Sequence, residues 1–291
     1  MRRQPLRLAV LDATAALAAA GVGSPRADAE ILAAHVVGVE RTRLPMVPLV
    51  DPLTIETYRR LVQQRVARVP LQHLTGWASM GPITVEVGPG VFTPRPETEL
   101  LLAWALQAID GMDHPVVLDL CTGSAALALA IAHQRPDAQV HAVESDPTAL
   151  AWARRNTDAR AAKGDTPVWL SQGDATDRRL LPELQGGVDL LVANPPYVPS
   201  EAPVPPEVGE HDPRIAVFAG PDGLDVLRPL VGHAAQWLAV GGAIGVEHEE
   251  SQADVVAGMF AVRTVFADVV VHPDLVGRAR FTTARRVSRS G

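Results

Sequence analysis

The segment Val188-Asp189-Leu190-Leu191-Val192-Ala193 runs directly into Asn194-Pro195-Pro196-Tyr197. An apolar run of this length, bounded by glycines before it and prolines after it, is typical of a short buried strand. Two successive prolines cannot donate to a sheet, so the strand ends there. The Asn194 amide and the Tyr197 ring are then held at the strand's carboxyl end, where open parallel sheets bind ligands. A Pro-rich turn without function is the alternative interpretation.

Strand and helix patterns alternate from residue 115 onward, which predicts an α/β fold with a parallel sheet and helices on both faces. The expected strands are 116–120, 139–144, 168–171, 190–193 and 243–247. The expected helices are 127–132, 147–156, 223–238 and 252–260. Segments 268–271 and 280–284 are expected to close the sheet as an antiparallel pair.

The first part of the chain has a different pattern. Residues 1–75 are expected to form a helical bundle with helices at 6–20, at 26–39 and from residue 52, and their apolar stripes are the packing faces. Glycines and an alternating segment in residues 76–94 predict a β-hairpin that links the bundle to a second domain, residues 95–291. The bundle carries no catalytic pattern, so its expected use is to dock a partner.

Composition restricts the class of protein. The chain has 291 residues, 47% of them hydrophobic and 20% charged, and a formal net charge of −7. A negative balance gives no overall attraction for nucleic acid or anionic membranes. One cysteine excludes internal disulfides and suits a reducing cytosol. Because no apolar stretch is long enough to span a membrane and Asp12 interrupts the only run that could be a signal peptide, we expect a cytoplasmic protein.

Two strand ends upstream carry further polar residues. Asp119-Leu120-Cys121-Thr122-Gly123-Ser124 is a strand-to-helix turn, where nucleotide-like ligands bind. Glu144, about 20 residues further on, is placed to bind ribose hydroxyls. Asp174 follows the third strand and could reach an adenine amino group. Ala125 breaks the G-x-G-x-x-G pattern, which argues against NAD, and neither the histidines nor the cysteine show metal-ligand spacing.

A proline-rich stretch precedes the first helix of the second domain. Thr93-Pro94-Arg95-Pro96 is rigid, and Arg95 between the prolines is a candidate ligand for a carboxylate or phosphate. Glu97 and Glu99 stand at the helix start, where capping alone could explain them.

The glycine loop, the acids at the next two strand ends and the Asn-Pro-Pro-Tyr turn follow one another along the chain in an order that resembles the class I S-adenosylmethionine-dependent methyltransferases. In that class, Asn-Pro-Pro-Tyr marks enzymes that methylate a planar amino or amide nitrogen. The motifs of the release factor glutamine methyltransferases (HemK/PrmC type) are also matched over nearly the whole chain: Thr93-Pro94-Arg95-Pro96-Glu97-Thr98-Glu99, Asp212-Pro213-Arg214, Gly220-Pro221-Asp222-Gly223-Leu224-Asp225 and Val246-Glu247-His248. The resemblance implies a Rossmann-like methyltransferase domain, a helical N-terminal domain and a hairpin linker. It also implies methylation of the glutamine side-chain nitrogen in the Gly-Gly-Gln motif of peptide chain release factors.

The resemblance also implies site residues. S-adenosylmethionine is expected to contact Asp119, Cys121, Thr122, Gly123, Ser124, Ala125, Glu144, Asp174, Ala175 and Asn194. The substrate is expected to contact Asn194, Pro195, Pro196, Tyr197 and Arg95, with Asn194, Pro195 and Tyr197 as the catalytic residues. An amide nitrogen is a poor nucleophile, so acceptors at Asn194 and Pro195 that orient it and stabilise its developing charge suit this reaction.

Three departures from the family's usual residues keep further interpretations open. Cys121 and Ala125 stand where the family usually has glycine, and Glu144 stands where aspartate is more frequent. The lost glycines motivate a scaffold that binds the cofactor without catalysis, although Asn-Pro-Pro-Tyr is intact. The motif is also compatible with methylation of a glutamine in a ribosomal protein or of an adenine in nucleic acid. The acidic balance argues against a nucleic-acid substrate.

Overall fold

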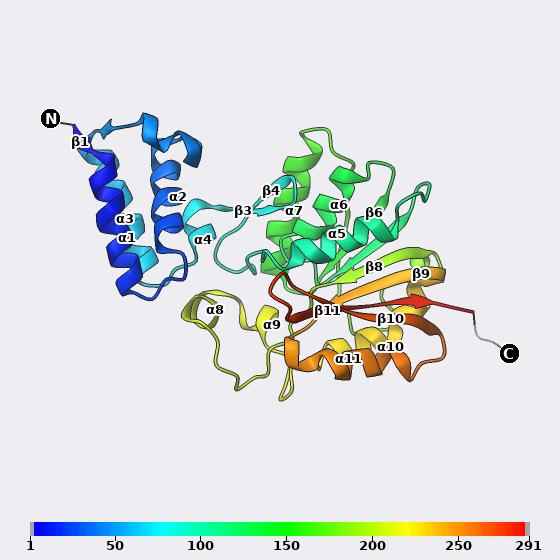
Figure 1. Ribbon diagram of the computed structural model, residues 1–291. Coiled ribbons are helices and arrows are strands. Elements are labelled where there is room, and N and C mark those ends of the chain that lie inside the picture. Colours follow the sequence, from blue (N-terminus) through cyan, green and yellow to red (C-terminus); the bar gives the residue numbers. More distant parts are fainter. Residues whose placement is uncertain (1–2, 289–291) are drawn as a thin grey trace. The chain divides into compact units, whose positions relative to one another are not determined.

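The computed structural model describes residues 3–288. It divides into two compact units: the first comprises the residues up to Trp77 together with Val204–His211, and the second comprises Ala78–Pro203 and the residues from Asp212 onward. The chain therefore leaves the second unit once, for eight residues, and returns to it. Figure 1 shows the elements of each unit.

The first unit is helical. Its helices are α1 (Leu6–Ala19), α2 (Pro25–Val37), α3 (Pro52–Val66), α4 (Leu71–Thr75) and α8 (Pro206–His211), with a 3-10 turn η1 (Arg41–Met46) and the short strand pair β1 (Gln4–Pro5) and β2 (Leu49–Val50). Local signals set these bounds: the Asp51 side chain accepts from the Thr54 amide at 2.9 Å at the start of α3, and Gly38 ends α2 in the left-handed conformation. Leu17, Leu32 and Tyr58 fill the core.

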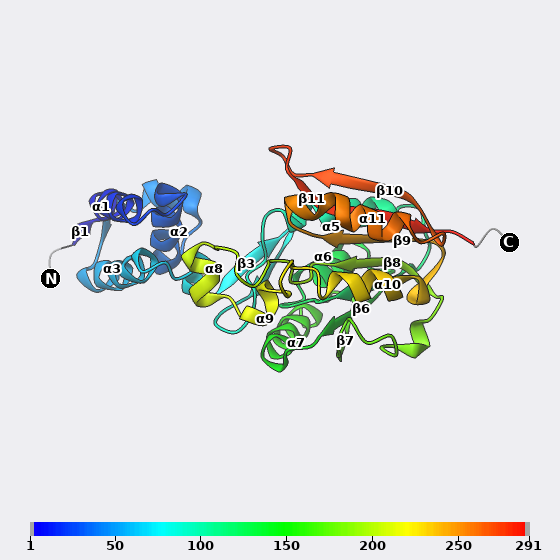
Figure 2. The same cartoon turned by 90° about the horizontal axis from the view of Figure 1, so that it is seen from below.

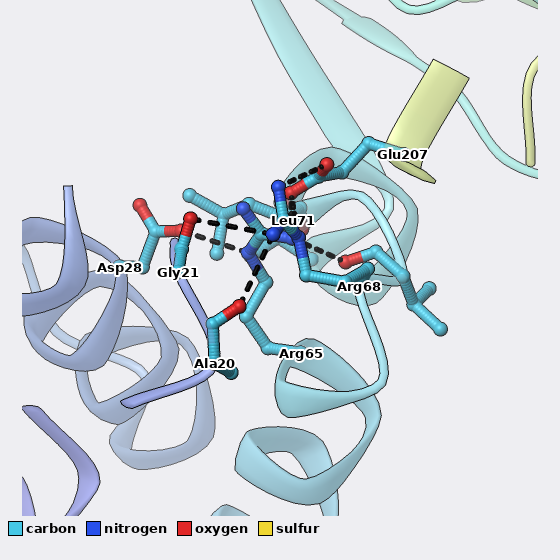
Figure 3. Close-up of polar contacts among 9 residues, drawn as sticks. Ala20, Gly21, Asp28, Arg65, Arg68, Leu71 and Glu207 are labelled. Carbon is cyan, nitrogen blue, oxygen red and sulfur yellow. Dashed lines mark hydrogen bonds and ion pairs between the residues drawn. The ribbon is translucent and has the colours of Figure 1, made fainter. Parts of the chain in front are cut away.

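Segment 204–211 belongs to this unit because its residue Glu207 forms ion pairs with arginines of the bundle. Glu207 on α8 accepts from Arg68 Nη2 at 2.6 Å and from Arg65 Nη1 at 2.9 Å, and Arg65 also binds Asp28 at 2.8 Å (Figure 3). Only 15% of the Glu207 side chain is exposed. The sequence pattern assigns these residues to the second domain, 95–291. In the structure they pack on the bundle through residues that lie about 140 positions earlier in the chain, and local patterns cannot reveal such contacts.

The second unit contains a seven-stranded sheet in the order β10-β11-β9-β8-β5-β6-β7. Its strands are β5 (Val116–Leu120), β6 (Gln139–Glu144), β7 (Trp169–Gln172), β8 (Val188–Ala193), β9 (Leu238–Glu247), β10 (Phe266–Pro273) and β11 (Ala279–Arg286). β5 to β9 are parallel, and β10 and β11 are antiparallel. Figure 2 shows β10 and β7 at opposite edges.

Helices cover both faces of this sheet, as the alternating pattern predicts. α5 (Thr98–Ala108), α6 (Ala126–Gln134) and α7 (Pro147–Ala161) pack on one face, and α10 (Leu227–Trp237) and α11 (Ala253–Ala261) on the other (Figure 1). The short helices α9 (Arg214–Val217), η2 (Pro182–Leu184) and η3 (Glu250–Gln252) lie in loops. The fold class and the closing antiparallel pair are confirmed.

The packing of one element and the start of another differ from what the sequence pattern predicts. The hairpin β3 (Trp77–Met80) and β4 (Ile83–Glu86) is present, but Met80, Ile83 and Val85 are buried in the core of the second unit, so the hairpin is more than a connection. α10 begins at residue 227 instead of 223 because the preceding loop is held against the turn that follows β8.

The strand order creates a crevice. From β5 the chain continues to β6 and β7 on one side and then returns to β8 on the other side of β5. At such a reversal the loops after β5 and β8 diverge, and ligands of open α/β sheets bind between them. The Asn194 turn and the glycine loop are the two segments at that position.

Candidate active site

A cavity of about 300 Å³ opens at the carboxyl ends of β5, β6, β7 and β8, entirely within the second unit. Of the residues expected to bind ligands, the following line it: Asp119, Cys121, Thr122, Gly123, Ser124, Glu144, Asp174, Ala175, Asn194 and Pro196. Residues from four separate strand ends are thus brought to one place. Its volume is at the lower end of the range found for small-molecule sites.

Four of the expected residues lie outside the lining of this cavity. Ala125 is fully buried at the start of α6, behind the glycine loop. Pro195 is buried. The half-buried Tyr197 packs against the core on the face of the sheet that α10 and α11 cover. Arg95 pairs with the buried Asp212 and lies over the Phe92 ring, 4.6 Å from its centroid. The structure therefore gives Arg95 an internal partner, and its contact with substrate stays a prediction.

The loop after β5 has an unusual backbone. Cys121 and Ala125 have φ of 60° and 63°, and Gly123 between them has φ of 58°. Left-handed φ values favour glycine, so two of these three positions are strained. A Cβ built on Gly123 would meet no atom within 4 Å, which shows that this backbone faces open space at the cavity.

Asp119, at the end of β5, is almost completely buried and accepts from the Thr122 hydroxyl at 2.5 Å. Burial raises the pKa of Asp119 to about 7, against the hydrogen bond from Thr122, which lowers it. The pair fixes the conformation of the loop that follows the strand.

Glu144, at the end of β6, is held by backbone groups. Its carboxylate accepts from the amides of Gly123 at 2.8 Å, Ser145 at 2.8 Å and Asp146 at 2.9 Å. Glu144 thereby joins the loop after β5 to the loop after β6. The Ser145 hydroxyl also donates to Oε1, at 3.4 Å, whereas Oε2, within the part of the chain that the structure describes, accepts only from Gly123, so Oε2 retains a lone pair for a ligand hydroxyl.

Asp174 and Ala175 follow β7. Asp174 is exposed, and its Oδ1 accepts from the amide and the hydroxyl of Thr176 at 2.8 Å and 2.7 Å. Ala175 is buried beside it. The turn presents an acidic group and a small apolar surface to the same end of the cavity.

The turn after β8 is supported from three directions. Asn194 Nδ2 donates to Thr98 Oγ1 at 3.1 Å, at the first residue of α5. Gln252 Nε2 donates to the Tyr197 carbonyl at 2.8 Å, and the Val198 amide donates to the Val217 carbonyl at 2.9 Å. The turn is therefore rigid, which suits a site that orients a reactant.

Gly223 allows a loop to reach this turn. It has φ of +76°, and a Cβ there would lie 2.1 Å from the Tyr197 carbonyl oxygen. Only glycine fits both restrictions. The motif around Gly223 can be read from the sequence, but the need for glycine at this position follows from the close approach of the Tyr197 carbonyl.

Sequence reasoning missed several cavity residues. Phe92, Pro94, Thr98, Ile215 and Val226 line the cavity without an expected role. Each lies in or directly beside a motif that carries the family resemblance, so motif membership was an available signal. Within residues 3–288, no cluster of three or more His, Cys, Asp or Glu side chains could hold a metal ion. Over the same residues, no helix is long and apolar enough to cross a membrane.

Known structures share this fold. A 16S rRNA N2 G1207 methyltransferase from T. thermophilus matches with a TM-score of 0.50 and 24% identity, over 72% of this chain and 49% of that one. The hMettl16 catalytic domain matches with a TM-score of 0.55 and 13% identity, over 71% of this chain and 76% of that one. The fold of the second unit is that of the class I methyltransferases.

Sequence comparison identifies the family. Residues 9–76 match the PrmC N-terminal domain, and residues 83–205 match the methyltransferase small domain. A release factor glutamine methyltransferase of Mycolicibacterium smegmatis is 51% identical over 98% of this chain and 99% of its own length. Those of Mycobacterium tuberculosis and Streptomyces coelicolor are 46% and 47% identical, over 97% and 95% of this chain and 91% and 96% of their own lengths. The chain belongs to the release factor glutamine methyltransferase family.

Proposed function

We propose that this protein transfers a methyl group from S-adenosylmethionine to the side-chain amide nitrogen, N(5), of the glutamine in the Gly-Gly-Gln motif of peptide chain release factors. One observation supports this most directly: the Asn194 amide lies at the wall of the cavity with its nitrogen engaged by Thr98. The Asn194 oxygen is then the end of the group available to accept from an incoming NH2.

The cavity residues fit the cofactor. Gly123 leaves open space where any other residue would place a Cβ, and the carboxylates of Glu144 and Asp174 lie at successive strand ends for hydroxyl and amino groups. S-adenosylmethionine supplies an electrophilic methyl group on a sulfonium. The left-handed backbone at Cys121 and Ala125 is already accommodated in this loop, which favours retained cofactor binding despite the two replaced glycines.

The turn after β8 performs the positioning. Asn194 Oδ1 and the Pro195 carbonyl accept the two hydrogens of the substrate amide and direct its nitrogen toward the cavity. Orientation of this kind is worth about 7 kcal/mol or more. The same two oxygens stabilise the positive charge that develops on the nitrogen. Tyr197 and Pro196 close the apolar side of the glutamine.

The first unit is proposed to contact the release factor away from the glutamine. Leu8 and Leu11 on α1 are 58% and 55% exposed, and Met46 is 80% exposed. We expect Leu11→Glu to raise KM for the intact factor and to leave turnover of a short Gly-Gly-Gln peptide unchanged. Equal KM for wild type and variant on the intact factor would show that this surface is not used.

Mass spectrometry of purified release factor tests the reaction. The factor is incubated with S-adenosylmethionine and either wild type or Asn194→Ala, and the modified residue is located by fragmentation. One methyl group on the Gly-Gly-Gln glutamine, lost in the variant, is the expected result. Methyl transfer to ribosomal protein or to adenine instead would replace the proposal, and binding of the cofactor without any transfer would favour the scaffold.

A further inference from the structure

The sheet places a buried carboxyl beside the Asn194 turn. The parallel ladder between β8 and β9 pairs Ala193 with Val246, so the next residues, Asn194 and Glu247, leave neighbouring strands side by side and on the same face. Glu247 is 4% exposed, and among the described residues its Oε1 has no hydrogen-bond partner. A buried carboxyl is costly to the fold, and functional sites are where such costs persist.

α5 covers that face of β9 and supplies a hydroxyl. A Cβ on Gly245 would meet Trp104 and Leu101 of α5 at 2.5 Å and 2.8 Å, which shows how closely the helix lies on the strand. Thr98, at the start of the same helix, is 4% exposed. Its oxygen accepts from Asn194 Nδ2 at 3.1 Å, and the same side chain lies beside Glu247, where it lowers the pKa of that carboxyl against the effect of burial.

An amide side chain has two ends, and its neighbours decide which end faces the substrate. A threonine hydroxyl has one proton to donate. When Glu247 accepts that proton, through a carboxylate oxygen or through the carbonyl oxygen of the neutral acid, Thr98 can offer only lone pairs to Asn194. A reversed amide would then place its oxygen against the Thr98 oxygen with no hydrogen between them, which is unfavourable.

We propose that Thr98, backed by Glu247, is a positioning residue that sets the Asn194 amide with its nitrogen inward and its oxygen toward the substrate. The inference rests on the proposed function for its purpose, but the orientation itself is measurable without any substrate. Thr98 acts through Asn194, and Glu247 acts through Thr98.

The chain offers a direct probe, because Asn156 and Asn194 are its only two asparagines. Protein labelled with ¹⁵N in the asparagine side chains gives two NH2 signal pairs, and Asn194→Ala assigns them. Asn156 donates to the carbonyls of Glu86 and Ser124 at 2.9 Å and 3.0 Å, so its pair is an internal control for folding.

Thr98→Val removes the hydroxyl with little change in shape. We expect the Asn194 pair to shift and its hydrogens to exchange with water roughly tenfold faster, the effect of losing one hydrogen bond. Thr98→Ser, which keeps the hydroxyl, should restore the wild-type signals. Thr157→Val, which removes another buried helical hydroxyl, should leave the Asn194 pair in place. An unchanged Asn194 pair in Thr98→Val would overturn the inference.

Kinetics then separates this role from the proposed reaction. With release factor as substrate, we expect Thr98→Val to lower kcat about tenfold while the Kd for S-adenosylmethionine and KM stay near wild type. A shifted amide signal with unchanged kcat would contradict the purpose assigned to Thr98. Wild type without activity on release factors would refute the proposed function and leave the signal shift to decide the orientation.

Discussion

Gln252 donates from Nε2 to the main-chain oxygen of Tyr197 at 2.8 Å, and the same nitrogen donates to the Asp222 carbonyl at 3.0 Å. Its own carbonyl accepts from the Glu249 amide at 3.0 Å, so every polar end of this buried side chain is used. Gln252 thus joins the turn after β8 to the loop that carries Gly223. The connection links two motifs that lie about 25 residues apart in the sequence.

Gln252→Leu is expected to loosen the Asn194 turn. It leaves two carbonyls and one amide without their partner, which costs about 1–3 kcal/mol of stability for each group that stays buried. We expect kcat/KM for release factor to fall while cofactor affinity is retained, as measured by steady-state kinetics and calorimetry. Gln107→Ala, at an exposed position on α5, is the control. Wild-type kcat/KM in Gln252→Leu would contradict this role.

Ala125→Gly is expected to stabilise the protein. Ala125 has φ of 63°, a conformation that costs a non-glycine residue about 1–2 kcal/mol. Glycine relieves that strain, but it also raises the entropy of the unfolded chain, which offsets part of the gain. We therefore expect the free energy of unfolding in urea to rise by about 1 kcal/mol. Ala125 lies behind the cavity, so cofactor affinity should change little. A large gain in affinity would instead show that the substitution of glycine had weakened cofactor binding in this chain.

Glu247→Gln is expected to change how stability depends on pH. Burial raises the pKa of Glu247 to about 8 from 4.5, against the hydrogen bond from Thr98; Glu97, Arg280 and Asp119 are the charged groups that act on it. Between these values the folded state keeps a proton that the unfolded chain releases, so stability falls as pH rises from 4.5 to 8.

Comparing Glu247→Gln with wild type isolates the effect of this carboxyl, because Asp119 lowers the stability of both proteins by a similar amount as pH rises. The melting temperature of Glu247→Gln relative to wild type should be higher at pH 8 than at pH 5. Two curves that stay parallel across this range would show that the Glu247 proton is not linked to folding.

Glu207→Gln is also expected to change how stability depends on pH, but in the acid range. Burial raises the pKa of Glu207, but hydrogen bonds from Arg68, from the backbone and from Arg65 outweigh it and lower the value to about 2 (Figure 3). The stabilising effect is therefore complete above pH 4.5 and is lost as pH falls toward 2.

At neutral pH the Glu207→Gln variant should lose about 1–3 kcal/mol in urea unfolding, because two arginines lose a buried charged partner. Glu210→Gln, exposed on the same helix, should behave like wild type. The difference between Glu207→Gln and wild type should shrink in acid; a difference that persists at pH 2 would exclude the ion pairs as its cause.

The strands at 116–120 and 139–144 are predicted at their observed residues because buried apolar runs between turn residues are a local signal. Most expected cavity residues lie together because parallel strands end at a common edge. The contact of Arg95 with substrate stays a prediction; the structure pairs Arg95 with Asp212, 117 residues away, a partner that no local pattern encodes. Thr98 lies in the motif at residues 93–99, but the role inferred for it has no local signal, since that role depends on two neighbours from other elements.

The sequence by itself determined the fold class, the main strands and helices and the residues at each strand end, because hydrophobic periodicity, proline and glycine act over a few positions. The tertiary structure alone decided the strand order, the packing of segment 204–211 on the bundle, and the partners of Asn194. Those depend on which distant groups meet in space. A hydrogen bond or ion pair is specified by both partners and by the fold that brings them within about 3 Å, not by either residue alone.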